Sequence, residues 1–267
     1  MGKVWFVGAG PGASDLITVR GARLLGEAGA ILYTGSLVAE TVLEWASKDC
    51  EIADSKSMDL EQVNAWLLDR ASRHETVVRL QTGDPTLYGV VAELARPLDA
   101  AGIPIGIVSG VSSAMASAAA AGESLTLPEV TQTVIFTRLS GRTKMPESES
   151  LVSLAAHGCT LCIFLSIDRI DAVVAQLQEA GWASSASVVV VHKATWPGEE
   201  QVLRGTLEDI AGRCRAEGID RQALILVSPA LGARSRPQTR TSKLYDNAFP
   251  RRFRPGHNRG NSGTDRD

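Results

Sequence analysis

The sequence predicts an α/β protein with two α/β domains, a mainly parallel sheet in the first and a mixed sheet in the second. In the first half, short runs of β-branched and apolar residues alternate with helical stretches, which is the βαβ order of a parallel sheet covered on both faces. After the segment GESLTLP at 122–128 the alternation becomes less regular, and antiparallel strands fit it better. The expected domains are 1–121 and 122–231, with a tail over 232–267.

The elements of the first domain follow from these patterns. Its expected strands cover 3–8, 30–33, 51–53, 76–81 and 104–108, and its expected helices cover 15–28, 36–46, 59–73, 86–101 and 112–121. Asp84 directly before Pro85 is typical of a helix start, with aspartate as the N-cap and proline in the first helical position.

The second domain has the same kinds of signal in a different order. Its expected strands cover 132–137, 159–166, 187–192, 199–205 and 222–228, and its expected helices cover 149–157, 168–180 and 206–217. A polar loop over 138–148 separates its first strand from its first helix.

Composition places the chain among ordinary globular proteins. It has 267 residues, of which 44% are hydrophobic and 21% are charged, which is typical of a folded protein with a sizeable core. The sequence has no apolar run of 18 residues, and its start lacks the basic stretch and apolar core of a signal peptide. We therefore expect a cytoplasmic protein that does not enter a membrane.

The charge is unevenly distributed along the chain. The net charge is −3, and the tail from Gly232 onward carries nine basic and three acidic residues. The tail therefore has a charge of about +6 and the body a charge near −9, which argues against general nucleic-acid binding. Because the tail is rich in arginine, glycine, asparagine and serine, we expect it to be disordered.

The four cysteines do not indicate a disulfide framework or a metal site. Cys159 and Cys162 form an isolated C-x-x-C inside an apolar, strand-like run, without a second pair or a histidine cluster nearby. This pattern favours buried packing over metal binding or redox chemistry.

The first strand runs directly into a glycine-rich segment, GAGPG at 8–12, and a helix is expected to begin near Asp15. Such a corner brings backbone N–H groups close to a ligand, because no Cβ is in the way. Gly8, Gly10 and Ala13 also fit the weak form of the dinucleotide fingerprint. Pro11 removes a donor, however, and no carboxylate follows the second strand before Glu40, whereas that fingerprint expects one about 20 residues on. A nicotinamide site and a turn without a ligand stay open as alternatives.

Two further strands of the first domain end in the same way. The strand 76–81 is followed by TGDPTLYG at 82–89, and the strand 104–108 by SGVSS at 109–113. Because the carboxyl ends of parallel strands meet at one edge of a sheet, three such corners favour a shared ligand crevice over three independent turns.

Together these motifs resemble the tetrapyrrole (corrin/porphyrin) methylases, which use S-adenosylmethionine. The resemblance covers about residues 3–231 and is carried by VGAGPG at 7–12, DLIT at 15–18, TGDP at 82–85 and GVSS at 110–113. Further segments resemble the subgroup that methylates carbon 11 of precorrin-4, namely 33–38, 125–128, 131–138, 141–143, 145–147 and 193–197. The chain departs from that subgroup at Thr34, where alanine is usual, and at Lys144, where proline is common.

The resemblance implies a class III S-adenosylmethionine methyltransferase fold, a homodimer, and an active-site cleft between the two domains. It also implies S-adenosylmethionine as the cofactor and S-adenosylhomocysteine as its product. The cofactor contacts that it implies are Pro11, Thr82, Gly83, Asp84, Leu87, Tyr88, Ser112, Ser113, Leu165, Ala194, Pro229 and Ala230.

The substrate that the resemblance implies is precorrin-4, which is methylated to precorrin-5 in cobalamin biosynthesis. Because a precorrin carries many acetate and propionate groups, an acidic protein must place cations locally to bind it. The expected substrate-binding residues are Met58, Gln132, Arg138, Arg142 and Lys193, with Lys144 and Trp196 as further candidates. No residue is identified as a catalytic base. Two alternatives remain, a cobalt-precorrin-4 C(11)-methyltransferase of the anaerobic route and, more distantly, a nicotinamide-dependent dehydrogenase.

Overall fold

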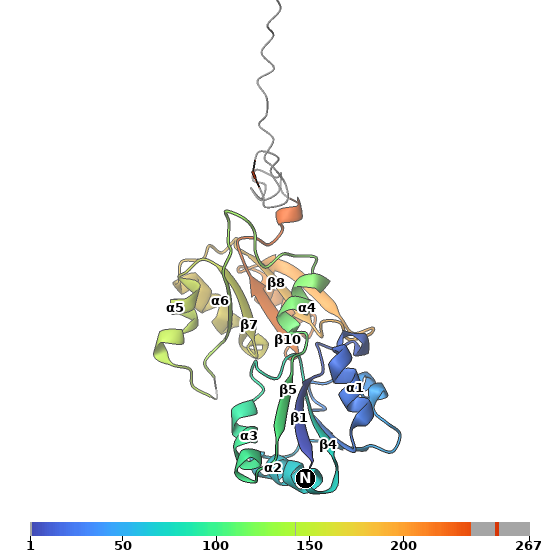
Figure 1. Ribbon diagram of the computed structural model, residues 1–267. Helices are drawn as coiled ribbons and strands as arrows, with labels where there is room; N and C mark the ends of the chain where they lie inside the picture. Colours follow the sequence, from blue (N-terminus) through green and yellow to red (C-terminus); the bar gives the residue numbers. More distant parts are fainter. Residues whose placement is uncertain (1, 142, 236–248, 251–267) are drawn as a thin grey trace, which may run out of the picture.

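The computed structural model describes residues 2–141, 143–235 and 249–250. Figure 1 shows two α/β units joined end to end, the first coloured from blue to green and the second from green to orange. Arg142 and almost all of the tail that the sequence predicts to be disordered lie outside the described residues. None of the described helices is long and apolar enough to cross a membrane.

The first sheet is entirely parallel, in the strand order β3-β2-β4-β1-β5. Its strands are β1 (Lys3–Gly8), β2 (Ala30–Tyr33), β3 (Glu51–Asp54), β4 (Thr76–Gln81) and β5 (Ile105–Val108). Because β1 lies between β4 and β5, the strands that end in the three glycine-rich corners are neighbours. The corners therefore meet at one edge of the sheet, as the sequence predicts.

Helices cover both faces of this sheet because side chains along each strand alternate between them. On β1, Val4 and Phe6 pack with α2 (Leu60–Arg73) and α3 (Val91–Ala100), while Val7 packs on the other face with α1 (Val19–Glu27). The start of α2 is fixed by a capping box between Asp59 and Gln62. Such a cap satisfies two backbone donors reciprocally.

Several expected helices are shorter than the sequence predicts. The stretch 15–28 divides into a 3-10 turn, Ser14–Leu16, and α1, because Thr18 caps α1 by accepting from the Gly21 N–H. The stretch 36–46 contains only a 3-10 helix, Glu40–Trp45. Within the stretch 86–101 only Val91–Ala100 (α3) is helical. The N-cap of α3 is Val90, so Asp84 does not cap this helix.

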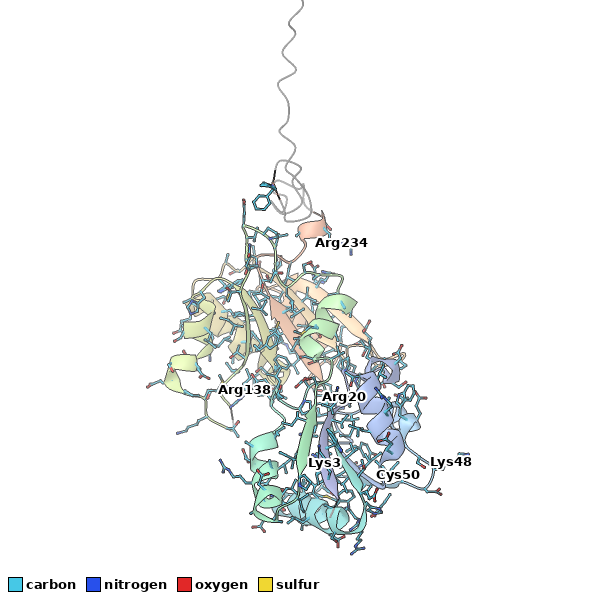
Figure 2. The ribbon with its side chains drawn as sticks, in the orientation of Figure 1. Lys3, Arg20, Lys48, Cys50, Arg138 and Arg234 are labelled. Carbon is cyan, nitrogen blue, oxygen red and sulfur yellow. The ribbon has the colours of Figure 1, made fainter. Side chains whose placement is uncertain are left out.

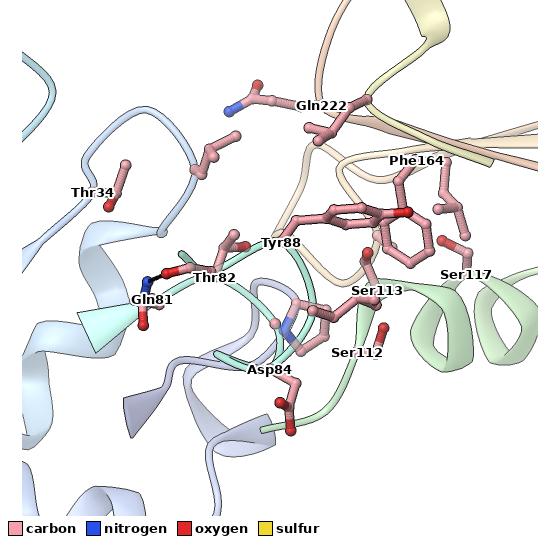
Figure 3. A pocket seen from close by; sticks show the side chains of 18 of the residues that line it. Thr34, Gln81, Thr82, Asp84, Tyr88, Ser112, Ser113, Ser117, Phe164 and Gln222 are labelled. Carbon is pink, nitrogen blue, oxygen red and sulfur yellow. Dashed lines mark hydrogen bonds between the residues drawn. The ribbon is translucent and has the colours of Figure 1, made fainter. Parts of the chain in front are cut away.

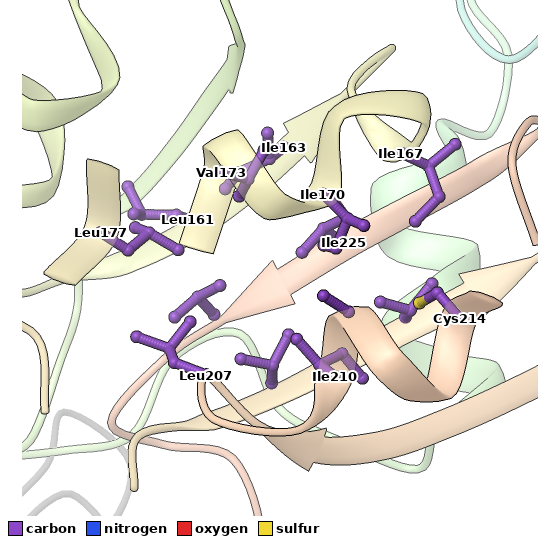
Figure 4. Packing of buried hydrophobic residues seen from close by; sticks show 14 of the residues in the cluster. Leu161, Ile163, Ile167, Ile170, Val173, Leu177, Leu207, Ile210, Cys214 and Ile225 are labelled. Atoms are coloured by element: carbon purple, nitrogen blue, oxygen red, sulfur yellow. The ribbon is translucent and has the colours of Figure 1, made fainter. Parts of the chain in front are cut away.

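The second sheet is mixed, in the order β6-β7-β10-β8-β9, and only β6 and β7 are parallel. Its strands are β6 (Val134–Arg138), β7 (Thr160–Phe164), β8 (Ser187–His192), β9 (Gln201–Thr206) and β10 (Ala223–Val227). One face is covered by α5 (Leu151–Ala155), α6 (Ile170–Glu179) and α7 (Ile210–Ala216). Figure 4 shows this core, in which Val173 and Leu177 of α6 and Ile210 of α7 pack over Ile225 of β10. Short 3-10 turns lie at Glu147–Glu149, Ile167–Arg169 and Ala233–Ser235.

The helix α4 (Ser113–Ala120) covers the other face of the second sheet. Its small side chains, including Ala114 and Ala118, pack against Cys162 and Leu226 of β7 and β10. Although α4 precedes the expected boundary at residue 121, it packs in the core of the second sheet. Cys162 is a packing residue there, and burial raises the pKa of its thiol to about 12.

Candidate functional site

The three glycine-rich corners touch through their backbones. A Cβ on Gly8 would lie 2.5 Å from the Gly83 carbonyl oxygen, and one on Gly110 would lie 2.0 Å from the same atom. No larger residue fits at either position without a backbone shift. The first and second corners are also hydrogen bonded, because the Gly83 N–H donates to the Gly10 carbonyl at 2.8 Å. The close approach that the sequence predicts for these glycines is therefore present.

A cavity of about 370 Å³ opens above these corners and is closed by the second domain. Ten of the twelve residues expected to contact a cofactor line it, namely Pro11, Thr82, Gly83, Asp84, Leu87, Tyr88, Ser112, Ser113, Leu165 and Ala194. Figure 3 shows the polar side chains Thr34, Gln81, Ser112, Ser113 and Ser117 around it. The structure thus brings most of the expected contacts to one place between the domains.

Pro229 and Ala230 do not line this cavity. β10 runs antiparallel to β8, so its first residue, Ala223, lies at the cavity end and Val227 lies at the other end. The segment after β10 is held at that distant end, where the Ser228 and Thr160 hydroxyls lie 2.6 Å apart. Gln222, Ala223 and Leu224, at the beginning of the strand, line the cavity instead.

Asp84 connects the second and third corners. One carboxylate oxygen accepts from the backbone N–H and hydroxyl of Thr86 at 2.8 and 2.6 Å, and the other accepts from the Gly110 N–H at 3.0 Å. Burial alone would raise the pKa of this carboxyl, but these hydrogen bonds outweigh it and hold the pKa below its ordinary value. Asp84 is therefore a charged positioning residue that shapes the cavity floor.

Besides the Arg79 Nε, two buried polar atoms in the cavity wall have no hydrogen-bond partner in the described part of the chain. They are the Gln81 Oε1 and the Ser117 Oγ, and their residues are 6% and 0% exposed. Buried polar atoms are nearly always satisfied in folded proteins. These two therefore indicate a cavity built for a ligand that carries polar groups.

The rest of the wall is largely apolar. The Tyr88 ring lies 5.5 Å from the Phe164 ring (Figure 3), and Leu165 and Val90 also line the cavity. Tyr88, Val90 and Leu165 have positive φ values of 60°, 48° and 49°, a conformation that bulky residues rarely adopt outside functional sites. Burial raises the pKa of the Tyr88 hydroxyl, so it is neutral at physiological pH.

The expected substrate-binding residues are not all brought together. Arg138, at the end of β6, lies at the level where the two domains meet (Figure 2) and lines two further cavities beside the main one. Gln132 precedes β6, near Thr160 at the opposite end of the sheet, and Met58 packs against the first-domain core. The structure therefore places neither Gln132 nor Met58 in the cavity. Lys144 lines one of these further cavities together with Arg138.

The connection between β8 and β9 joins the second domain to the first glycine-rich corner. The Trp196 Nε1–H donates to the Pro11 carbonyl at 3.1 Å, and the Ala13 N–H donates to the Thr195 hydroxyl at 3.1 Å. Lys193 forms an ion pair with Glu199, and its ammonium lies 5.0 Å from the centre of the Trp196 ring. Lys193 is thus engaged within its own loop, and Trp196 holds the corner at Pro11.

We expect the substitution Trp196→Phe to weaken S-adenosylhomocysteine binding about fivefold, because losing one hydrogen bond costs roughly 1 kcal/mol. The matched control is Trp182→Phe, which removes a 2.9 Å bond from an indole to the Ala155 carbonyl in the second-domain core. Calorimetric titration should show weaker binding for the Trp196 variant alone. Equal losses in both variants would contradict a specific role for Trp196.

Some residues of the cavity are not anticipated by the sequence analysis. Arg79, Gln81 and Leu37 line it from the first domain, and Gln222 lines it from the second. Arg79 carries a signal that was available, since it is a charged residue inside an otherwise apolar strand, and such residues are rarely buried without a reason. Gln81, Leu37 and Gln222 carry no such signal in the sequence, because their place in the cavity depends on how the two domains meet.

Comparison with known proteins identifies the class. The family model described as Tetrapyrrole (Corrin/Porphyrin) Methylases matches residues 3–211. The chain therefore belongs to the tetrapyrrole methylase family, which confirms the resemblance and the two-domain fold class expected from it.

Individual relatives are similar over nearly their whole length. The chain is 44% identical over 253 residues to the precorrin-4 C(11)-methyltransferase of Pseudomonas aeruginosa, covering 95% of this chain and 99% of that one. The chain is also similar to a cobalamin biosynthetic enzyme of known X-ray structure, cobalt precorrin-4 methyltransferase. The two sequences are 44% identical and the structures superpose with a TM-score of 0.83, over 86% of this chain and 95% of that one. The uroporphyrin-III C-methyltransferase of Thermus thermophilus complexed with S-adenosylhomocysteine is 28% identical with a TM-score of 0.70, covering 87% and 94%.

Proposed function

We propose that this protein transfers the methyl group of S-adenosylmethionine to carbon 11 of precorrin-4 in cobalamin biosynthesis. Support comes from its membership of the tetrapyrrole methylases and from the relatives that carry this activity in their names. The observation that carries the proposal is the convergence of three glycine-rich corners on one cavity closed by the second domain.

The cavity has the properties that such a cofactor requires. A Cβ on Gly83 would meet nothing closer than Ser112 and Ser113, at 3.8 Å, so this glycine leaves open the space between the second corner and α4. Gln81 Oε1 and Ser117 Oγ are available to polar groups of the ligand. When bound, S-adenosylmethionine supplies a methyl group on a sulfonium, whose charge disperses as the methyl leaves.

The residues of the chain contribute position and a dry environment. Pro11, Gly83, Ser113 and Ala194 come from four separate segments around one cavity, and holding two reactants in line supplies much of the acceleration in such transfers. The apolar side chains of Tyr88, Val90 and Leu165 line the cavity and exclude water where a bound ligand covers them. Direct transfer of the methyl group from the sulfonium to a carbon atom requires no side-chain nucleophile.

Cations beside the cavity provide for an acidic substrate. Arg138 donates to the carbonyls of Leu139, Thr143 and Lys144, and Arg169 donates to the carbonyl of Ser140. In the described part of the chain, neither guanidinium forms an ion pair with a carboxylate. Both charges therefore remain available to the acetate and propionate groups of a tetrapyrrole. Arg142, between them in the sequence, stays a predicted contact.

We expect Arg138→Gln to raise the KM for the tetrapyrrole about tenfold, the equivalent of one charge-assisted hydrogen bond, and to leave S-adenosylhomocysteine affinity unchanged. Glutamine keeps N–H donors for the loop carbonyls but removes the charge. The control is Arg215→Gln, which removes the same charge from an exposed pair with Asp171 on α6. Loss of both affinities, or of neither, would contradict this division of roles.

The functional test is an anaerobic assay with metal-free precorrin-4 and with cobalt-precorrin-4. The relatives include enzymes named for each form, so turnover of both substrates should be compared by the mass shift of the product. NMR of a ¹³C-methyl product should place the new methyl group on carbon 11. Methylation at another carbon, or binding of NAD in place of S-adenosylhomocysteine, would refute the proposal.

We also propose that the active protein is a cytoplasmic homodimer. β5 is an edge strand with Ile107 exposed, and α4 exposes Met115. Exposed apolar side chains on neighbouring elements are typical of an interface. Light scattering should give twice the chain mass, and replacing Ile107 and Met115 by lysine should give the monomer mass.

A further inference from the structure

Arg79 is a buried cation in the cavity wall whose hydrogen bonds all go to neutral acceptors. It lies on β4 and is 7% exposed. Its Nη1 donates to the Ser55 hydroxyl at 2.8 Å and to the Leu32 carbonyl at 3.4 Å, and its Nη2 donates to the Thr34 hydroxyl at 3.0 Å. Its Nε has no partner in the part of the chain that the structure describes.

The nearby carboxylate does not neutralise this charge by contact. Asp54 accepts from the backbone N–H groups of Gly35 and Lys56 and pairs with the Lys56 ammonium at 3.4 Å. Burial lowers the pKa of Arg79 to about 10, so the guanidinium is still charged at neutral pH. A buried charge without a counter-ion is unfavourable unless another group supplies that counter-ion.

The donors that Arg79 leaves free define the missing group. A guanidinium has five N–H donors, and three are used on Ser55, Leu32 and Thr34. The two that remain are the Nε–H and one Nη2–H, and Nε and Nη2 share one edge of the planar guanidinium. The same pair of nitrogens binds a carboxylate elsewhere in this protein, where Arg70 Nε and Nη2 donate to the two oxygens of Glu51 at 2.7 and 2.5 Å. A planar carboxylate fits such a pair in a bidentate manner.

We propose that Arg79 binds a carboxylate of the ligand at the first-domain end of the cavity. The proposal rests on the proposed function, which offers two sources of that group. One is the methionine carboxylate of the cofactor, and the other is an acetate or propionate of the tetrapyrrole. Arg79, Gln81 and Thr34 line this end of the cavity together. Arg79 is the cation among them, so it is the residue that would pair with the carboxylate.

The test compares two ligands that differ in the carboxylate. S-adenosylhomocysteine has the amino-acid portion, whereas 5′-methylthioadenosine lacks it. Both are titrated calorimetrically into the wild type, Arg79→Met and Arg79→Lys, and the KM for the tetrapyrrole is measured for each protein. Arg79→Met removes the charge and nearly preserves the length of the side chain, and Arg79→Lys keeps the charge but not the paired donors.

Each source gives a distinct result. If the cofactor supplies the carboxylate, Arg79→Met weakens S-adenosylhomocysteine binding at least about tenfold and leaves methylthioadenosine unchanged. If the tetrapyrrole supplies it, both nucleoside affinities are unchanged and the KM rises at least about tenfold. Arg79→Lys shows a smaller effect in the same direction, and it carries the test if the methionine variant does not fold.

Two results would overturn the proposal. Equal weakening of both nucleosides would show that Arg79 only supports the fold, and unchanged affinities and KM would show that it meets no carboxylate. These outcomes are separate from a failure of the proposed function, which would appear as an absence of methyl transfer in the wild type. The nucleoside titrations do not depend on turnover.

Discussion

Replacing Gly83 by valine is expected to reduce S-adenosylhomocysteine affinity by roughly 100-fold, the equivalent of about 3 kcal/mol of overpacking. Gly83 has a φ of +60°, and its Cβ would point into the open space that faces Ser112 and Ser113 at 3.8 Å. The valine side chain would fill that space. It would also strain the backbone, because a left-handed conformation costs an ordinary residue about 1–2 kcal/mol.

The matched control for this substitution is Gly102→Val. Gly102 has a similar φ of +67°, and a Cβ there would meet no atom within 4 Å. The two variants should therefore lose similar thermal stability from backbone strain, while only the Gly83 variant loses affinity in a calorimetric titration. If Gly83→Val bound S-adenosylhomocysteine as the wild type does, the cavity would not be the cofactor site.

Replacing Asp84 by alanine is expected to weaken S-adenosylhomocysteine binding about 30-fold, because removing an acceptor from hydrogen bonds to a charged group costs roughly 2 kcal/mol. The carboxylate holds Thr86 and Gly110 in place from two neighbouring corners. Without this carboxylate, the hydrogen bond from the Gly110 N–H of the third corner to the second corner is lost. The fold itself should persist, because the strands remain paired through β1.

The role of Asp84 also predicts a pH dependence. Its hydrogen bonds lower the pKa of the carboxyl in the folded protein, so its stabilising effect is present above the ordinary pKa and is lost as the pH falls through the folded value. Wild-type affinity should decline in acid, and Asp84→Asn should remove that part of the decline. The control is Asp209→Asn, in a turn of the second domain where hydrogen bonds from Arg213 and Thr206 also lower the pKa. An unchanged acid profile in Asp84→Asn would contradict the assigned role.

The glycine-rich corners were predictable because they depend on local chemistry and a simple rule of topology. Gly8 ends β1, and Gly83 and Gly110 each follow the end of a strand closely. Parallel strands bring such ends to one edge of a sheet. Family resemblance supplied further residues of the cavity, including Leu165 and Ala194 from the second domain. These residues have no local feature that marks them as ligand contacts.

The positions that the sequence analysis did not anticipate depend on non-local pairing. Pro229 and Ala230 follow a strand whose direction is set by antiparallel partners distant in the sequence. The helix expected from residue 86 begins only at Val91, because Asp84 bonds to Gly110 as well as to Thr86 and the intervening turn lies in the cavity wall. The packing of α4 is non-local in the same way, since its alanines contact residues of the second sheet.

The most direct measurement is a crystal structure of the protein soaked with S-adenosylhomocysteine. The account predicts density for the ligand between the two domains, in contact with Gly83 on one side and Ala194 on the other. Density in any other place, or a cavity that stays without the ligand at saturating concentration, would contradict the central claim.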